Sequence, residues 1–303
     1  MTERRSVFPE LGARPRVLVP VIKGQMARPI VSLGDALLAF PGASGSLLAL
    51  VEADPTITGR LGTQDERRRD MLRWVASLEY DGAQRRRMSV TIRVTTDVAG
   101  SIRNVVAETQ STSVVLEWPS AQSPRRARLT ALMSQVAAAG VPADVLFVRP
   151  DPAKPNREVA PRSILVPIRG GANARAVVAT AAALADAYGS RLTLLHVQPS
   201  NSHPDRSRRE WETFGEIVAE LRRPTTRVRH LEGEAPAGIL AESAGHDLLI
   251  LGSRFNPQYP QLLIGRALMG TVRQIRSPVV VMRVRDVGWS APEQPPPKAA
   301  VAH

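Results

Sequence analysis

Hydrophobic residues in this chain fall into short runs rich in Val, Ile and Leu, and longer amphipathic segments separate the runs. Short apolar runs are typical of strands buried on both faces of a parallel sheet, and amphipathic segments between them are typical of crossover helices. For the second half, the pattern predicts strands over residues 163–168, 191–199, 226–234, 246–252 and 278–284.

The helices predicted between these strands have recognisable ends. The first has an apolar stripe at helical spacing, formed by Val177, Ala181, Leu184 and Tyr188. We expect Asn173 to cap its start and Gly189 to end it. Further helices are predicted over about 205–221, 236–244 and 264–275. The last must stop before Pro278, because proline disfavours the helical conformation in the residue before it.

The first half repeats the second. The segment RVLVPV at 16–21 returns as SILVPI at 163–168, and LLALVEA returns as TLLHVQP with Val51 opposite Val197. Later, SVVLEW and DVLFVR match LLILGS and VVVMR in the same order. Strands are therefore expected over 16–21, 46–53, 88–94, 113–119 and 144–149. We predict two similar domains over 14–150 and 163–286, a linker over 151–162 and a disordered tail over 287–303.

Composition narrows the function classes. The 303 residues include 40 Lys and Arg against 28 Asp and Glu, so the net charge of +12 favours an anionic partner or simple solubility. We interpret the arginine-rich segment 64–84 as a solvated helix, with nucleic-acid binding through 67–103 as a weaker alternative. The chain has no cysteine, and its five histidines lack a ligand-like spacing, which argues against a redox or zinc role. The N-terminus lacks the apolar core of a signal peptide, so a cytoplasmic location is expected.

The second half resembles the universal stress protein family over nearly its whole length, through ILVPI, LTLLHVQP, GEAPAGILAESAGHDLLILGSR and SPVVVMR. The first half resembles it through RVLVPV, SVVLEW and DVLFVR. The resemblance implies an α/β fold of two tandem doubly wound domains. Each would be a five-stranded parallel sheet with helices on both faces, and the domains would pair with one another.

Nucleotide-binding members of that family have a phosphate loop after the fourth strand, with the spacing glycine, two residues, glycine, nine residues, glycine, then Ser or Thr. This chain keeps the spacing in GSRFNPQYPQLLIGR, but Phe255 replaces the second glycine and Arg266 replaces the hydroxyl residue. Arg169 and Ile22 occupy the positions where the family has an Asp for the nucleoside. The first half has no glycine between Thr112 and Ala139, so we expect it not to bind nucleotide.

A candidate site is still expected where the predicted first and fourth strands of the second domain end, because ligands of doubly wound sheets bind there. The candidate binding residues are Arg169, Val197, Gly252, Arg254, Gly265 and Arg266. The three arginines could hold an anion in place of the lost Asp and Ser. The alternative, which we favour, is that they are solvated or pair with acidic residues across the domain interface.

Catalytic motifs are not apparent, and no catalytic or metal-ligating residue is predicted. We expect His196 to be packed in the core, His246 to be structural, and Asp247 to orient the start of a strand. Trp118 is expected to fill the space of a ligand in the first domain.

Two functional hypotheses follow. The first is a non-enzymatic regulatory or stress-response protein that acts through domain pairing and protein partners, as a homodimer or with a membrane transporter, and in which family-type ATP binding is lost or altered. The second is an ATP-binding protein that slowly hydrolyses ATP in its second domain. No cofactor is assigned with certainty, and ATP or another anionic nucleotide is the candidate.

Overall fold

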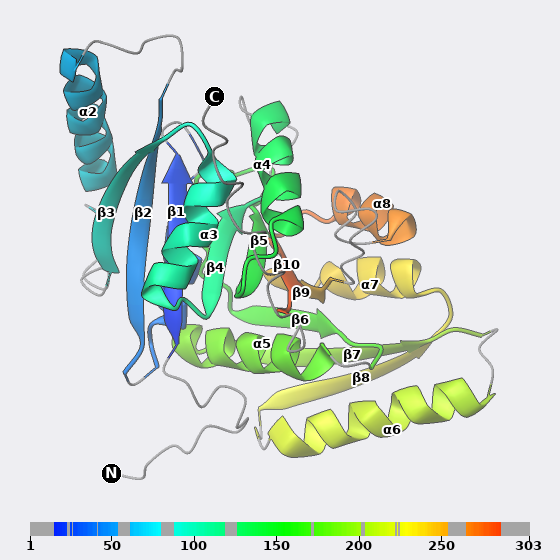
Figure 1. Ribbon diagram of the computed structural model, residues 1–303. Coiled ribbons are helices and arrows are strands. Elements are labelled where there is room, and N and C mark those ends of the chain that lie inside the picture. Colours follow the sequence, from blue (N-terminus) through cyan, green and yellow to red (C-terminus); the bar gives the residue numbers. More distant parts are fainter. Residues whose placement is uncertain are drawn as a thin grey trace, which may run out of the picture.

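The computed structural model describes residues 15–22, 25, 27–40, 42–53, 61–79, 88–118, 126–170, 173–200, 204–221, 223, 225–253 and 265–285. The first half contributes the strands β1 (Arg16–Ile22), β2 (Ser44–Glu52), β3 (Met88–Thr95), β4 (Ser113–Glu117) and β5 (Asp144–Arg149). The second contributes β6 (Ser163–Pro167), β7 (Arg191–Gln198), β8 (Thr226–Glu232), β9 (Leu248–Gly252) and β10 (Val279–Arg283). Together they form one ten-stranded sheet in the order β3-β2-β1-β4-β5-β10-β9-β6-β7-β8 (Figure 1).

Helices cover both faces of this sheet. Those of the first half are α1 (Ala27–Leu37), α2 (Leu61–Glu79), α3 (Val98–Thr109) and α4 (Arg126–Ala138). The second half has α5 (Ala174–Tyr188), α6 (Pro204–Leu221), α7 (Ala235–Ser243) and α8 (Arg266–Gln274). Buried residues of α1, α2, α5 and α6 share one hydrophobic core with one face of the sheet, and those of α3, α4, α7 and α8 share a second core with the other face. Each half is therefore doubly wound, as predicted.

The two halves join through their last strands. All neighbouring strands are parallel except β5 and β10, which pair antiparallel with Val281 opposite Phe147. Both of these side chains are fully buried. The expected domain pairing is therefore a continuous sheet, a detail that the repeat in the sequence did not indicate.

A buried arginine crosses this β5–β10 junction. Arg149 at the end of β5 is 7% exposed, and its Nη2 donates to the carbonyls of Ile275 at 2.8 Å and Ser277 at 2.7 Å. Burial lowers the pKa of Arg149 to about 10, and the negative charge of Asp151 partly opposes this shift. The side chain therefore stays charged near neutral pH and links the first half to the loop before β10.

The linker between the halves is anchored to both of them. Val159 is 3% exposed and belongs to the hydrophobic core that α1 and α5 share. Its backbone N–H donates to the Ser32 hydroxyl of α1 at 2.9 Å, while the Tyr188 hydroxyl of α5 donates to the Ser32 carbonyl at 3.1 Å. A proline-containing segment thus has a defined path between the two halves.

Most predicted elements are present, with shifts at their ends. The helix predicted over 64–84 begins earlier, at Leu61, and is described to Glu79. Gly189 ends α5 in the left-handed conformation, as expected. Asn173 occupies the position before α5, but its side chain makes no capping hydrogen bond, so that expectation was wrong. The predicted boundaries of the two domains, the linker and the tail stay predictions: 14–150, 163–286, 151–162 and 287–303.

Candidate functional site

The predicted site lies at the carboxyl ends of β6 and β9. These strands are hydrogen-bonded neighbours, with Leu165 opposite Leu249, and β7 flanks β6 on its other side. Chain segments leaving the three strands therefore meet at one edge of the sheet. Of the six predicted residues, Arg169, Val197, Gly252 and Gly265 are described here. Arg254 and Phe255 lie outside the described residues, and Arg266 is described only as the first residue of α8, without its side chain.

Arg169 forms an ion pair within the second half. Its Nε lies 3.3 Å from Oε1 of Glu210 on α6, and its side chain is 47% exposed against 15% for Glu210. The position that the family gives to a nucleoside-binding carboxylate thus holds a cation that is bound to a neighbouring helix. We expected a solvated arginine or a partner across the domain interface; the partner lies instead in the same half.

The segment that carries Arg169 rests against α6. Gly170 has φ +92°, a conformation that side chains rarely adopt. A Cβ at Gly170 would lie 3.6 Å from both the Cα and the carbonyl oxygen of Glu210. The glycine therefore permits both the turn and the close approach, so the start of the β6–α5 connection is held beside α6.

An aromatic cluster lies beside the same segment. His196 of β7 is 1% exposed, and its Nδ1 lies 3.1 Å from the carbonyl oxygen of Ile168. Its ring contacts Trp211 and Phe214 of α6 and His230 of β8, with ring centroids 5.2 to 5.6 Å apart. This agrees with the expected packed histidine. Burial lowers the pKa of His196, the Ile168 carbonyl and Glu210 oppose the shift, and His230 and Arg169 add to it.

The described glycines of the predicted phosphate loop have different surroundings. A Cβ at Gly252 would lie 3.2 Å from Cγ2 of Val177 on α5, so close packing between β9 and α5 favours a glycine there. Gly265 has φ −56° and ψ 153°, and nothing lies within 4 Å of a Cβ placed on it. Backbone conformation and space would therefore allow other residues at Gly265. Packing against Val177 accounts for Gly252 without a phosphate, whereas the described surroundings give no structural reason for a glycine at position 265.

Val197 is buried rather than available at the edge. Its side chain is 6% exposed and belongs to the core beneath α7 and α8. A Cβ at Gly238 of α7 would lie 3.3 Å from Cγ2 of Val197, which shows how closely that helix packs. Among the candidates described with their side chains, the structure thus leaves Arg169 as the one charged group at this edge.

Two further residues have structural roles. The nitrogens of His246 lie 2.8 Å from the Glu242 carbonyl and 2.9 Å from the Thr193 hydroxyl. Asp247 Oδ2 accepts hydrogen bonds from the N–H groups of Arg162 and Ser163 at 2.9 and 3.1 Å, and from the Ser163 hydroxyl at 3.0 Å. These bonds fix the start of β6 beside β9, in agreement with the expected role of Asp247. In the first half, Trp118 is 7% exposed and packs in the core of α3 and α4.

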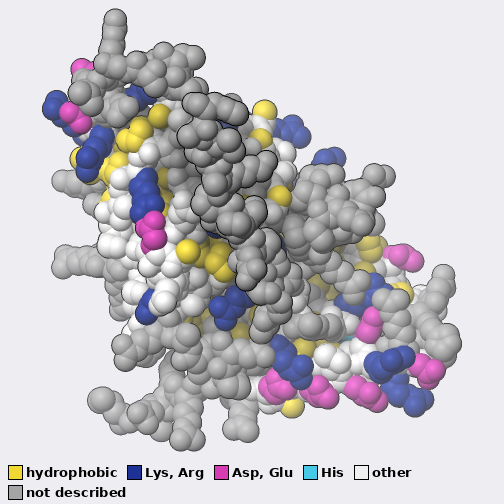
Figure 2. All heavy atoms as spheres, viewed as in Figure 1, with side chains coloured by type: hydrophobic (Ala, Val, Ile, Leu, Met, Phe, Trp, Pro, Cys, Tyr) yellow, Lys and Arg dark blue, Asp and Glu magenta, His cyan; other side chains and the backbone are white. Residues whose placement is uncertain are grey.

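Other classes of site gain no support from the described residues. No group of three or more His, Asp or Glu side chains within them could hold a metal ion. On the face seen in Figure 2, acidic and basic side chains lie next to one another over α2 and α6. On α2, for example, Arg73 forms an ion pair with Asp70 at 2.7 Å. This mixture agrees with the interpretation of α2 as a solvated helix.

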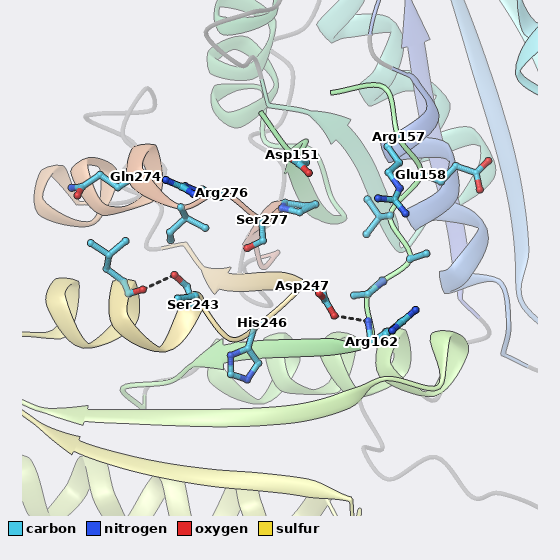
Figure 3. Close-up of a pocket in the computed structure, with 17 residues that line it drawn as sticks. Asp151, Arg157, Glu158, Arg162, Ser243, His246, Asp247, Gln274, Arg276 and Ser277 are labelled. Atoms are coloured by element: carbon cyan, nitrogen blue, oxygen red, sulfur yellow. Dashed lines mark hydrogen bonds between the residues drawn. The ribbon is translucent and has the colours of Figure 1, made fainter. Parts of the chain in front are cut away.

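A large cavity lies elsewhere in the second half, and it was not predicted from the sequence. It has a volume of about 740 Å³ and lies at the amino ends of β6, β9 and β10 (Figure 3). Its charged lining includes Arg157 and Arg162 of the linker and Arg276 after α8. The sole signal in the sequence was the position of two arginines within a proline-containing linker, which we had interpreted only as a connection.

Comparisons with known proteins agree with this architecture. The model of the universal stress protein family matches residues 161–283. A universal stress protein from Archaeoglobus fulgidus DSM 4304 has a similar structure, with a TM-score of 0.62 and 17% identity, covering 89% of this chain and 97% of that one. A functionally unknown protein, PA1789 of Pseudomonas aeruginosa PAO1, gives 0.56 and 14%, covering 92% and 95%.

The cytoplasmic domain of a prokaryotic cation chloride cotransporter is also similar, with a TM-score of 0.54 and 13% identity over 89% of this chain and 95% of that one. No match was found among curated proteins. Within the described residues, no helix has both the length and the apolar character needed to cross a membrane. Residues 161–283 are therefore a domain of the universal stress protein family, within a tandem chain that has the fold of solved universal stress proteins across both halves.

Proposed function

We propose that this chain is a non-enzymatic regulatory protein in which family-type ATP binding by the second half has been lost. The observation that carries the proposal is the ion pair between Arg169 and Glu210. A nucleoside hydroxyl would need an acceptor at this position, and Arg169 offers only donors. The Arg169 side chain is also held by α6, on the segment where the nucleoside would have to approach.

In this proposal the protein acts by binding other proteins through its surface and not by catalysing a reaction. The continuous sheet holds the two halves in a fixed arrangement, and a rigid pair of domains is suited to binding other proteins. Because the cytoplasmic domain of a cotransporter has a similar fold, a membrane transporter is one class of partner within this proposal. Cross-linking in intact cells followed by mass spectrometry of the membrane fraction tests it, and a protein that cross-links to no membrane protein would contradict the transporter version.

A second candidate is an altered anion site that uses Arg169 together with Arg254 and Arg266. The observation in its favour is that the Arg169 side chain is 47% exposed, against 15% for Glu210, and ion pairs that solvent reaches contribute only about 0 to 1 kcal/mol. A phosphate group could therefore displace Glu210 at small cost. Hydrolysis of a bound ATP is the enzymatic extension of this candidate.

Isothermal titration with ATP, a cyclic dinucleotide and sulfate separates the two candidates. The primary proposal expects no saturable heat that depends on Arg169, so any binding at ligand concentrations up to roughly 1 mM should be the same in wild type and in Arg169→Gln. The anion-site candidate expects binding that Arg169→Gln weakens, with Arg191→Gln, an exposed arginine at the opposite end of β7, as the matched control. ATP binding with phosphate release, abolished by Arg169→Gln, would overturn the primary proposal.

A further inference from the structure

The cavity in Figure 3 lies at the opposite end of the second half from the candidate site. It is bounded by the linker residues 157–162, by the carboxyl-terminal ends of α7 and α8, and by the starts of β6, β9 and β10. Its volume of about 740 Å³ falls within the range of ordinary small-molecule sites, which is about 300 to 1,000 Å³. A ligand here would touch both the segment that connects the two halves and the core of the second half.

Three arginines of this cavity have no side-chain partner in the part of the chain that the structure describes. Arg157, Arg162 and Arg276 all line it, and all three are exposed. Among the residues that the structure describes, none of their guanidinium groups takes part in a hydrogen bond or an ion pair. Arginine binds phosphate and carboxylate groups through two parallel N–H bonds, so three unengaged guanidinium groups around one cavity favour an anionic ligand.

The acidic side chains of the cavity are engaged elsewhere. Asp247 accepts three hydrogen bonds at the start of β6. Asp151 accepts a hydrogen bond from the Ala153 N–H at 2.8 Å and faces the charge of buried Arg149. In Figure 3 the carboxylate of Glu158 points away from the cavity, and its charge contributes to the raised pKa of Tyr188, although burial of Tyr188 is the larger cause. The carboxylates therefore leave the arginines uncommitted.

The helix ends at the cavity are also satisfied. Carbonyl groups at the end of a helix repel an anion unless hydrogen-bond donors offset them. The Leu240 carbonyl accepts from the Ser243 hydroxyl at 2.7 Å, and Arg149 Nη2 donates to the carbonyls of Ile275 and Ser277. The Ser277 hydroxyl oxygen is buried and has no hydrogen-bond partner within the described part of the chain.

We propose that this cavity binds a small polyanion, a molecule with two or more phosphate groups, between Arg157 and Arg162 of the linker and Arg276 after α8. Two or more anionic groups are required because the labelled arginines lie at different sides of the cavity in Figure 3, with Arg276 across from Arg157 and Arg162 of the linker. The bound molecule would tie the linker to the second half, so binding would stabilise the arrangement of the two halves. The site is independent of Arg169.

Isothermal titration of the full chain with inorganic tripolyphosphate tests the proposal. Wild type is expected to bind with a dissociation constant below roughly 1 mM at low salt. The double variant Arg157→Gln/Arg276→Gln is expected to bind at least about tenfold more weakly, because two charge-assisted contacts are removed. Arg227→Gln, which removes an exposed arginine of β8 that has no ion pair among the described residues, is the matched control and should change the affinity less than about twofold.

The proposal would be overturned by no saturable binding of wild type, by equal affinity in the double variant, or by equal weakening in Arg227→Gln, which would indicate attraction to the net charge alone. Weakening by Arg169→Gln would move the site to the other end of the sheet and equally overturn it. Monophosphate should bind far more weakly than tripolyphosphate, and equal binding would contradict the polyanion class. Far-UV circular dichroism and the melting temperature without ligand confirm that each variant is folded.

Discussion

At the residue scale, His196 shows how burial sets the charge state of a side chain. Its imidazole lies between the rings of α6 and β8, and its Nδ1 reaches the Ile168 carbonyl on the segment that leads to Arg169. The charged groups facing it are His230 on β8, Glu210 on α6 and Arg169. A proton added to His196 would place a second cation near Arg169 in a largely dry environment.

The lowered pKa of His196 makes the stability of the protein depend on pH. The unfolded chain takes up a proton on this residue as the pH falls through about 6.5, whereas the folded chain does so only at lower pH. The contribution is therefore complete above pH 6.5 and is lost as the pH falls toward the folded pKa. Urea unfolding at pH 7.5 and 5.5 should show a larger loss of stability for wild type than for His196→Gln.

Substitution of a second histidine provides the control for this measurement. His246→Gln replaces a histidine that also has both packing and hydrogen-bond partners, so it tests whether any histidine change has the same effect. An equally reduced pH dependence in His246→Gln would show that the effect is not specific to His196. Identical pH dependence in His196→Gln and wild type would show that His196 does not titrate differently in the folded state.

At the scale of single elements, two helical glycines have opposite surroundings. A Cβ at Gly34 of α1 would lie 2.4 Å from Cγ2 of Val19 on β1, so α1 packs directly on the sheet there. A Cβ at Gly215 of α6 would meet nothing within 4 Å. The same substitution therefore tests tight packing at one site and helix propensity alone at the other.

Gly34→Ala should destabilise the protein by about 1 to 3 kcal/mol, because the added methyl group overpacks the core. Gly215→Ala should stabilise it by about 0.5 to 1 kcal/mol, because alanine favours the helical conformation. Chemical denaturation of both variants against wild type measures the difference. A stabilised Gly34→Ala variant would mean that α1 can move away from β1 freely.

The helices and strands were predictable where the local sequence determines the backbone conformation. The first four residues of β9 and of β10 are consecutive buried apolar residues, and Gly189 adopts the left-handed conformation that its position after α5 suggested. The partner of Arg169 was not predictable, because Glu210 lies 41 residues away on a helix whose placement depends on the tertiary fold. The cavity at the linker was not predictable for the same reason. Its arginines line one cavity only after the linker has packed on α1.

At the scale of the whole molecule, the β5–β10 pairing makes the two halves one structural unit. Val281 of β10 is 0% exposed. It lies between Phe147 of β5, in the first half, and Leu251 of β9, in the second half. Since hydrophobic side chains of both halves pack along this junction, we expect wild type to unfold in a single transition. Calorimetric and van 't Hoff enthalpies should then agree.

Val281→Asp should lower the melting temperature strongly or split the transition, because an aspartate there has no buried partner and costs several kcal/mol. Val228→Asp on β8 is the matched control, since Val228 is 43% exposed. Its effect should stay within about 1 kcal/mol. Equal effects of the two substitutions would show that the junction does not couple the halves.

The antiparallel pairing of β5 with β10 also sets the relative direction of the strands in the two halves, whatever the similarity of their sequences. The strands of one half run antiparallel to those of the other half. The edges formed by the carboxyl ends of the strands, where ligands of doubly wound sheets bind, therefore face opposite poles of the molecule. No single small molecule can span both poles. Substitutions at one pole leave the other untouched, and a duplicated chain of this kind can keep, alter or discard each of its two sites on a separate evolutionary schedule.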